Sequence, residues 1–150
     1  MKTIIVSACL LGIPCRYDGK SKPISDELFN KICEDAVVIP FCPEVAGGLP
    51  TPREPCEIIS GRAVNRNGDD CSAEFNKGAE LLSELVKSKG ADLCILKSNS
   101  PSCGKHKIYD GSFSGTLIDG SGIAAKLLKN NGFVVFDETE LDEVYSIIKN

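Results

Sequence analysis

Cysteine is the residue type most able to do chemistry here, because eight of the 150 residues are cysteines. A thiolate is a nucleophile and a soft metal ligand, so such a set predicts metal binding or thiol chemistry. Three cysteines fall in expected helices or strands, where a free thiol packs as a small apolar group: Cys33, Cys71 and Cys94. Five others lie among glycine, proline and serine and need a separate explanation: Cys9, Cys15, Cys42, Cys56 and Cys103.

Two kinds of metal centre are compatible with thiols spread this widely. Structural zinc sites usually have close Cys-x-x-Cys pairs and four ligands. This sequence has no such pair, and its only histidine is His106. Iron–sulfur clusters accept widely spaced cysteines, and three protein ligands on a four-iron cluster leave one iron open. The spacing alone leaves the choice of metal open.

The segment from Cys9 to Arg16 offers an alternative without metal. It resembles the phosphate-binding loop of small cysteine-dependent phosphatases, in which the cysteine attacks phosphorus and the arginine holds the phosphoryl oxygens. Six residues separate Cys9 from Arg16, one more than such loops have. This interpretation also leaves Cys42 and Cys103 unexplained, so it is the weaker one.

Other polar residues near the cysteines are candidates for supporting roles. Glu44 follows Cys42 by two residues and is a candidate general base. Around Cys103, the serines and Gly104 are expected to form a turn whose amides and hydroxyls face an anion or a polar ring edge. We expect Arg16, Asp18 and Arg53 to form an ion-pair scaffold for the loops. His106 lies between two lysines, which is typical of a solvated surface, and it is a poor candidate for a catalytic triad.

Composition narrows the class of protein. Hydrophobic residues make up 42% and charged residues 25%, as in ordinary globular proteins, and 150 residues fit a single α/β domain over 1–150. The net charge of −4 argues against nucleic acid as a partner. No apolar run is long enough for a membrane span or a signal peptide. We therefore expect a cytoplasmic protein.

Apolar runs alternate with amphipathic segments along the chain. We expect strands at 3–8, 36–41, 93–96 and 133–136. Helices are expected from Ser25, at 72–89, at 123–131, and after an Asp137–Glu140 capping box. Residues 43–70 are expected to form a long loop with a short hairpin near 57–64. This order predicts a Rossmann-like three-layer α/β fold with a mostly parallel sheet of about four to five strands.

Three of the five unexplained cysteines follow predicted strands. Cys9 comes directly after the first strand, Cys42 after the second, and Cys103 shortly after the third. Because ligands bind beyond the carboxyl ends of the strands in such sheets, these three thiols are expected to share one site.

These segments together resemble the domain-of-unknown-function 523 family, whose characterised members are thiouracil desulfidases. The matching stretches are 7–12 (SACLLG), 15–19 (CRYDG), 42–45 (CPEV) with 47–53 (GGLPTPR), and 97–104 (KSNSPSCG). The resemblance extends over essentially the whole chain.

The resemblance implies an enzyme that removes sulfur from a small thiocarbonyl compound, such as a thiolated nucleobase, without net redox change. It implies a 4Fe–4S cluster held by Cys9, Cys42 and Cys103, with one open iron for the substrate's sulfur. Glu44 would then be the acid/base, and Ser100 and Ser102 would bind substrate or relay protons. Two alternatives stay open: a non-catalytic iron–sulfur or thiol sensor or sulfur carrier, and the phosphatase-like enzyme.

Overall fold

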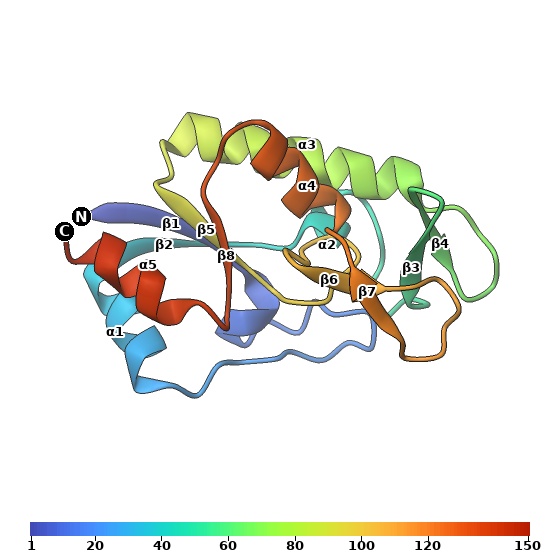
Figure 1. Cartoon of the computed structure of the whole chain (residues 1–150), viewed down its shortest axis with the longest axis horizontal. Coiled ribbons are helices and arrows are strands. Elements are labelled where there is room, and N and C mark those ends of the chain that lie inside the picture. Colours follow the sequence, from blue (N-terminus) through green and yellow to red (C-terminus); the bar gives the residue numbers. More distant parts are fainter.

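The computed structural model describes all 150 residues, and its centre is a four-stranded sheet (Figure 1). In spatial order the strands are β2 (Ala36–Phe41), β1 (Lys2–Ser7), β5 (Leu93–Leu96) and β8 (Val135–Asp137). Each neighbouring pair runs parallel. The predicted mostly parallel sheet is therefore confirmed.

Two helices cover each face of this sheet. On one face lie α1 (Glu27–Asp35) and α5 (Leu141–Ile148), and on the other lie α3 (Ser72–Lys89) and α4 (Ile123–Asn130) (Figure 1). This arrangement confirms the predicted three-layer α/β fold.

Strand β1 shows how one apolar run serves two cores. Ile4 and Val6 enter the core under α1 and α5, whereas Ile5 between them enters the core under α3 and α4. All three side chains are fully buried. A strand that is apolar on both faces has to be covered on both, so this run occupies an interior position in the sheet.

Two helix starts differ from the predictions. Helix α1 is capped by Asp26 and not by Ser25, because the Asp26 carboxylate accepts hydrogen bonds from the amides of Leu28 (2.7 Å) and Phe29 (3.1 Å). Helix α5 begins at Leu141, so the expected capping box is incomplete.

Half of that capping box is present. Glu140 Oε1 accepts from the Asp137 amide at 3.0 Å, but the Asp137 carboxylate accepts from the amide of Thr139 and does not cap the helix. Asp137 also ends strand β8, which is shifted along the chain from the predicted 133–136.

Shorter elements gather beyond the carboxyl ends of the strands (Figure 1). The predicted hairpin is present as β3 (Cys56–Ile59) and β4 (Arg62–Asn65). The 3-10 helix η1 (Ala8–Leu11), helix α2 (Pro43–Ala46) and a second hairpin were not predicted. That second hairpin pairs β6 (Lys107–Tyr109) with β7 (Leu117–Asp119).

Helix α2 is held against α3 by a close approach of their backbones. A Cβ atom at Gly78 would collide with the Pro43 carbonyl, and one at Gly47 would collide with the Glu74 carbonyl. Both positions therefore need glycine, and this contact fixes the segment that follows Cys42.

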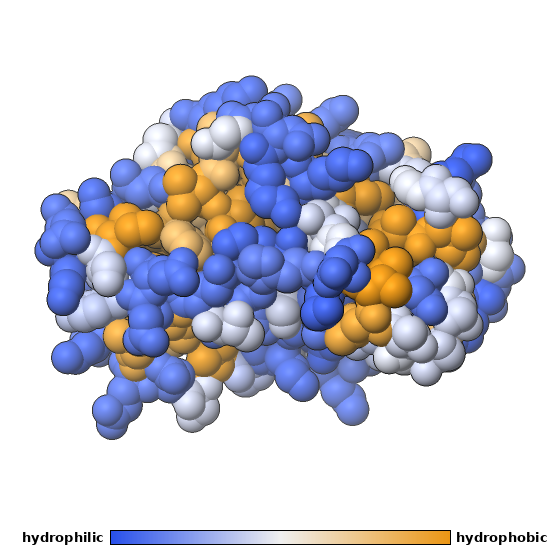
Figure 2. All heavy atoms as spheres, in the orientation of Figure 1, coloured by the Kyte–Doolittle hydropathy of each residue, from blue (hydrophilic) through white to orange (hydrophobic).

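The surface is mixed in character. Figure 2 shows apolar side chains gathered on the right of the view, over the hairpins. Strands β3 and β7 of these hairpins contain the exposed large apolar residues Ile59, Leu117 and Ile118. None of the helices combines the length and the apolar character that crossing a membrane would require.

Candidate active site

A cavity of about 670 Å³ opens at the carboxyl edge of the sheet. One wall is made by the segments that follow β1, β2 and β5, and the other by the two hairpins. All five cysteines that needed a separate explanation line it: Cys9, Cys15, Cys42, Cys56 and Cys103. The predicted gathering of thiols at this edge is thus present.

The three cysteines that follow strands come from three adjacent strands. Cys9 lies in η1, which follows β1. Cys42 follows β2 and is the N-cap residue of α2, and Cys103 lies in the loop after β5. Cys9 and Cys103 are buried, and Cys42 is half-buried. The Cys103 sulfur accepts a hydrogen bond from the Ser7 hydroxyl at 3.4 Å.

The surroundings of two of these thiols raise their pKa values. Burial raises the pKa of Cys103 to about 12, although hydrogen bonds from Ser7 and Ser102 oppose the rise. Two causes raise the pKa of Cys42 well above its usual value: the larger is a hydrogen bond with Cys15, and the next is burial. Binding a metal would require release of the thiol protons.

The donor set fits an iron–sulfur cluster better than a single ion. Thiolates on one tetrahedral zinc, with Zn–S near 2.3 Å, would lie about 3.8 Å apart. The sulfur atoms of Cys9, Cys42 and Cys103 do not all lie within 4.8 Å of one another. A cluster gives each cysteine its own iron and so accepts a wider spacing.

Glu44 lies beside the cysteines and has a fixed orientation. Its Oε2 accepts a hydrogen bond from the Ser102 hydroxyl at 2.7 Å, and its Oε1 lies 3.2 Å from both Nε and an Nη atom of Arg53. Both side chains of this ion pair are largely buried, at 14% exposed for Glu44 and 7% for Arg53. Arg53 also donates to the carbonyl oxygen of Cys15 at 3.0 Å, so it links the base to the loop after β1.

Ser100 organises the loop that carries Cys103. Its hydroxyl accepts from the amides of Ser102 and Cys103, both at 3.1 Å, and lies 2.9 Å from the Ser102 hydroxyl. The expected turn is therefore formed, but these two amides bond within the loop and do not present donors to an anion. The chain of hydroxyls instead runs from Ser100 through Ser102 to Glu44.

Helix α4 supports this loop from behind. The amides of Ile123, Ala124 and Ala125 donate to the carbonyls of Pro101 and Ser102 at 2.9 to 3.1 Å. These bonds satisfy amides of the first helical turn and fix the Cys103 loop at the same time.

The comparison with known families decides the relationship of this chain. Residues 4–140 match the family described as 2-thiouracil desulfurase. The chain belongs to this family. It is 41% identical over 151 residues to an uncharacterised protein, YbbK, of Bacillus subtilis (strain 168), covering 94% of this chain and 99% of that protein.

A solved structure extends the match to three dimensions. It is the [4Fe-4S]-dependent thiouracil desulfidase TudS, with a TM-score of 0.93, 44% sequence identity and coverage of 99% of each chain. The expected membership in the domain-of-unknown-function 523 family is confirmed, because that solved structure carries the DUF523 designation.

Two further thiols of this desulfurase-family chain lie in contact with others. The Cys42 thiol lies 3.9 Å from the Cys15 carbonyl oxygen, and the neighbouring thiols of Cys42 and Cys9 are among the causes that shift the pKa of Cys15. The Cys56 thiol lies against Cys71, and burial is the main cause that raises the pKa of Cys56 to about 12. Cys71, the N-cap residue of α3, packs beside Cys56 against a small apolar cluster and does not line the cavity, as its expected packing role predicted.

Other expectations have different outcomes. Cys94 is buried in β5, and Cys33 on α1 packs against the core, as predicted. Of the expected ion-pair scaffold only Arg53 is paired, since the Arg16 guanidinium lies 5.9 Å from the Tyr17 ring and the Asp18 carboxylate accepts from the Lys20 amide.

The geometry after Cys9 does not support a phosphate-binding loop. The amides of Gly12, Ile13 and Cys15 donate to carbonyl oxygens within the same turn. They are therefore unavailable to a phosphoryl group.

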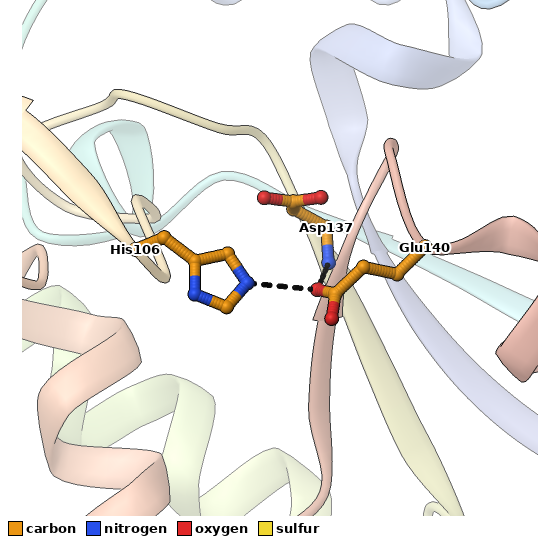
Figure 3. Close-up of side chains that lie close together, drawn as sticks. All are labelled: His106, Asp137 and Glu140. Atoms are coloured by element: carbon orange, nitrogen blue, oxygen red, sulfur yellow. Dashed lines mark hydrogen bonds and ion pairs between the residues drawn. The ribbon is translucent and has the colours of Figure 1, made fainter.

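His106 lies outside the cavity, in a separate polar cluster with Asp137 and Glu140 (Figure 3). Its Nε2 is 3.2 Å from Glu140 Oε1, and the imidazole is 55% exposed. Lys105 also contacts Glu140, with its ammonium 2.9 and 3.0 Å from the two carboxylate oxygens. Because a lysine already neutralises the carboxylate, this cluster is an ion-pair group and not a cation site.

The hairpin wall contains residues that the sequence analysis missed. Glu57, Tyr109 and Phe113 line the cavity, and Glu57 is buried at 8% exposure. An acidic residue between Cys56 and two isoleucines was a signal in the sequence, because a charge in an apolar strand is rarely buried without partners.

Proposed function

We propose that this chain is an iron–sulfur-cluster-dependent, non-redox desulfidase. It replaces the sulfur of a thiolated nucleobase, or of a similar small thiocarbonyl compound, by oxygen from water and releases hydrosulfide. The observation that carries this proposal is the Ser102–Glu44 hydrogen bond of 2.7 Å, in the same cavity as three thiols from three adjacent strands.

The sheet edge supplies the ligands of the cofactor in this proposal. Cys9, Cys42 and Cys103 hold a 4Fe–4S cluster as thiolates. When bound with three protein ligands, such a cluster supplies an open iron, a Lewis acid toward the thiocarbonyl sulfur.

Glu44 is the general base. Arg53 neutralises and orients one carboxylate oxygen, and the other faces Ser102. The carboxylate takes a proton from a water molecule as that water attacks the thiocarbonyl carbon. No electrons are transferred overall: water and the thiocarbonyl give a carbonyl and hydrogen sulfide, which leaves as hydrosulfide after losing a proton.

Ser102 and Ser100 move and hold protons. The Ser102 hydroxyl donates to Glu44 and lies next to the Ser100 hydroxyl, so a proton taken by Glu44 has a hydrogen-bonded route along the loop. Ser100 also keeps Ser102 in place, because its hydroxyl oxygen accepts hydrogen bonds from the backbone amides of Ser102 and Cys103.

The test is anaerobic reconstitution with iron and sulfide, followed by an absorption spectrum and an assay of hydrosulfide from 2-thiouracil and 4-thiouracil. We expect a broad band at about 400 nm from thiolate-to-iron charge transfer, with sulfide release. A stable cluster without release from either compound would contradict the enzyme and favour a sensor or sulfur carrier. If no cluster forms, the proposal is wrong, and the cysteines would act as thiols without metal.

The setting of this activity is also a proposal. All eight cysteines are free, which supports a reducing, cytoplasmic location. The net charge of −4 supports a small-molecule substrate in preference to nucleic acid.

A further inference from the structure

The loop between β6 and β7 holds Phe113 in an unusual backbone conformation. Its φ is +57°, and positive φ is a genuine outlier for a bulky aromatic residue. Ser112 and Ser114 on either side are exposed, whereas Phe113 is half-buried and lines the cavity. Such conformations persist where the surroundings fix them, and they are found at ligand-contacting positions.

A buried carboxylate on the other hairpin fixes this conformation. Glu57 Oε1 accepts hydrogen bonds from the amides of Gly111 (2.9 Å) and Phe113 (3.1 Å). These bonds join the β6–β7 loop to strand β3 on both sides of Ser112. The direction in which the Phe113 side chain leaves the backbone is therefore set by Glu57.

The Phe113 ring has a cation beside it and shares its cavity with the catalytic groups. The Arg66 guanidinium lies 5.8 Å from the ring centroid, close enough for a cation–π contact. Cys56, next to Glu57 along β3, lines the same cavity, as do Glu44 and the three strand-end cysteines. The sheet edge thus supplies polar and sulfur atoms, and the hairpin side supplies a flat aromatic surface.

We propose that Phe113 is a specificity-determining residue whose ring stacks on the conjugated ring of a cyclic thiocarbonyl substrate, with Glu57 as its positioning residue. The inference rests on the proposed function for the reaction, but binding of the ring is measurable without turnover. Stacking favours a heteroaromatic thiocarbonyl over an acyclic one, because an acyclic molecule offers no ring face.

The experiment compares calorimetric binding of 2-thiouracil and of thiourea to the cluster-loaded full chain, with Glu44→Gln present in every protein, the wild-type reference included, so that turnover does not consume the ligand. For Phe113→Ala we expect the Kd of 2-thiouracil to rise about tenfold, which is the usual size of a lost base–aromatic stack, and that of thiourea to stay unchanged. Phe113→Trp should stay within about twofold of the wild type, because it keeps an aromatic face. Tyr145→Ala is the control, since Tyr145 on α5 also has a cation near its ring, Lys149 at 5.5 Å, but lies outside the cavity.

The role of Glu57 is tested by asking whether Glu57 affects substrate binding only by positioning Phe113. Glu57→Gln keeps an oxygen that accepts both amides, so the Kd of 2-thiouracil should stay near the wild-type value. Glu57→Leu removes the acceptor and should raise the Kd of 2-thiouracil about tenfold, as Phe113→Ala does. The double variant should bind no more weakly than Phe113→Ala alone, because the two changes remove one interaction.

The outcomes separate this inference from the proposed function. An unchanged Kd of 2-thiouracil in Phe113→Ala, or an equal loss for thiourea, would overturn the stacking role. No binding of 2-thiouracil by the wild type would overturn it as well. If the ring binds with the expected dependence on Phe113 while the chain with Glu44 intact releases no hydrosulfide, the desulfidase proposal fails and the inference stands.

Discussion

The sheet edge and the two hairpins form opposite walls of one cavity, and they are built in different ways. The sheet wall consists of short segments that follow parallel strands, so hydrogen bonds of the central sheet fix its residues. The hairpins lie outside that sheet and are tied to each other by side-chain contacts such as the two hydrogen bonds that Glu57 accepts from the amides of Gly111 and Phe113. We conclude that the first wall is suited to hold a cofactor, and the second to select a substrate by its shape.

Serine substitutions of cysteine should separate the two walls most strongly. Cys9→Ser, Cys42→Ser and Cys103→Ser, on the sheet wall, should each lose the cluster and reduce sulfide release by about a hundredfold or more, because a thiolate ligand is lost. Cys56→Ser, on the hairpin wall, should keep its iron content. Iron content per chain and the absorbance at about 400 nm, where cysteine-bound clusters absorb, measure the difference between the variants of the two walls. Full cluster retention in all three sheet-wall variants would show that the ligands lie elsewhere.

The second-largest difference between the walls is expected when their carboxylates, Glu44 and Glu57, are replaced. Glu44→Gln should keep the cluster but lower kcat by about 100- to 1,000-fold, because an amide cannot accept the proton. Glu57→Gln should change kcat by less than about threefold, since it still accepts the two backbone amides. Steady-state rates with 2-thiouracil, measured at equal iron content, test this pair. A similar loss in both variants would argue against Glu44 as the base.

Gly78→Ala tests how far the sheet wall depends on helix packing behind it. The new methyl group would meet the Pro43 carbonyl, so α2 or α3 has to shift. We expect a loss of about 1–3 kcal/mol in the free energy of unfolding, as for other overpacked sites. Asn76→Ala, at an exposed position of the same helix, is the control and should not destabilise. Chemical denaturation of both variants measures the effect, and equal stabilities would refute the contact.

The smallest effect is expected outside both walls, at Glu140. Burial raises the pKa of Glu140, but hydrogen bonds from Lys105, the Asp137 amide and His106 outweigh it, and the pKa lies below its usual value. A depressed carboxylate pKa stabilises the fold above the unfolded-state pKa, about 4.3, and the gain disappears as the pH falls through the folded value.

Glu140→Gln should therefore lower the thermal midpoint at pH 7 by a small amount, and the difference from the wild type should vanish under acid conditions. Asp119→Asn removes an exposed partner of Lys107 and serves as the control, with no measurable change expected at either pH. A deficit that persists in acid would mean that Glu140 stabilises by packing.

The sequence predicts the sheet wall far better than the hairpin wall. Strand β5 and helix α3 have the predicted bounds, because an apolar run and a helical repeat ending at Gly90 are strong local signals. The convergence of Cys9, Cys42 and Cys103 on one cavity follows from parallel strands alone.

The hairpin wall gives weaker signals. Strands β6 and β7 have three residues each, and the residues of β7 are exposed, so no periodic pattern marks them. The bond between Glu57 and Phe113 joins residues 56 positions apart and depends on a backbone conformation that phenylalanine seldom adopts. At α1, Ser25 and Asp26 are adjacent residues that both cap helices well, and only the folded chain selects Asp26.

The parallel order β2-β1-β5 has a consequence for how this chain can change in length. Neighbouring strands lie about 4.8 Å apart, and a shift of one residue turns a side chain to the opposite face of the sheet. Cys42 continues β2 in an extended conformation, so an insertion between β2 and Cys42 would turn its thiol away from the cavity. The Ser112–Gly115 segment has no strand behind it to impose that alternation. Insertions and deletions there should displace Phe113 and change how substrate binds, while leaving the cofactor ligands in place.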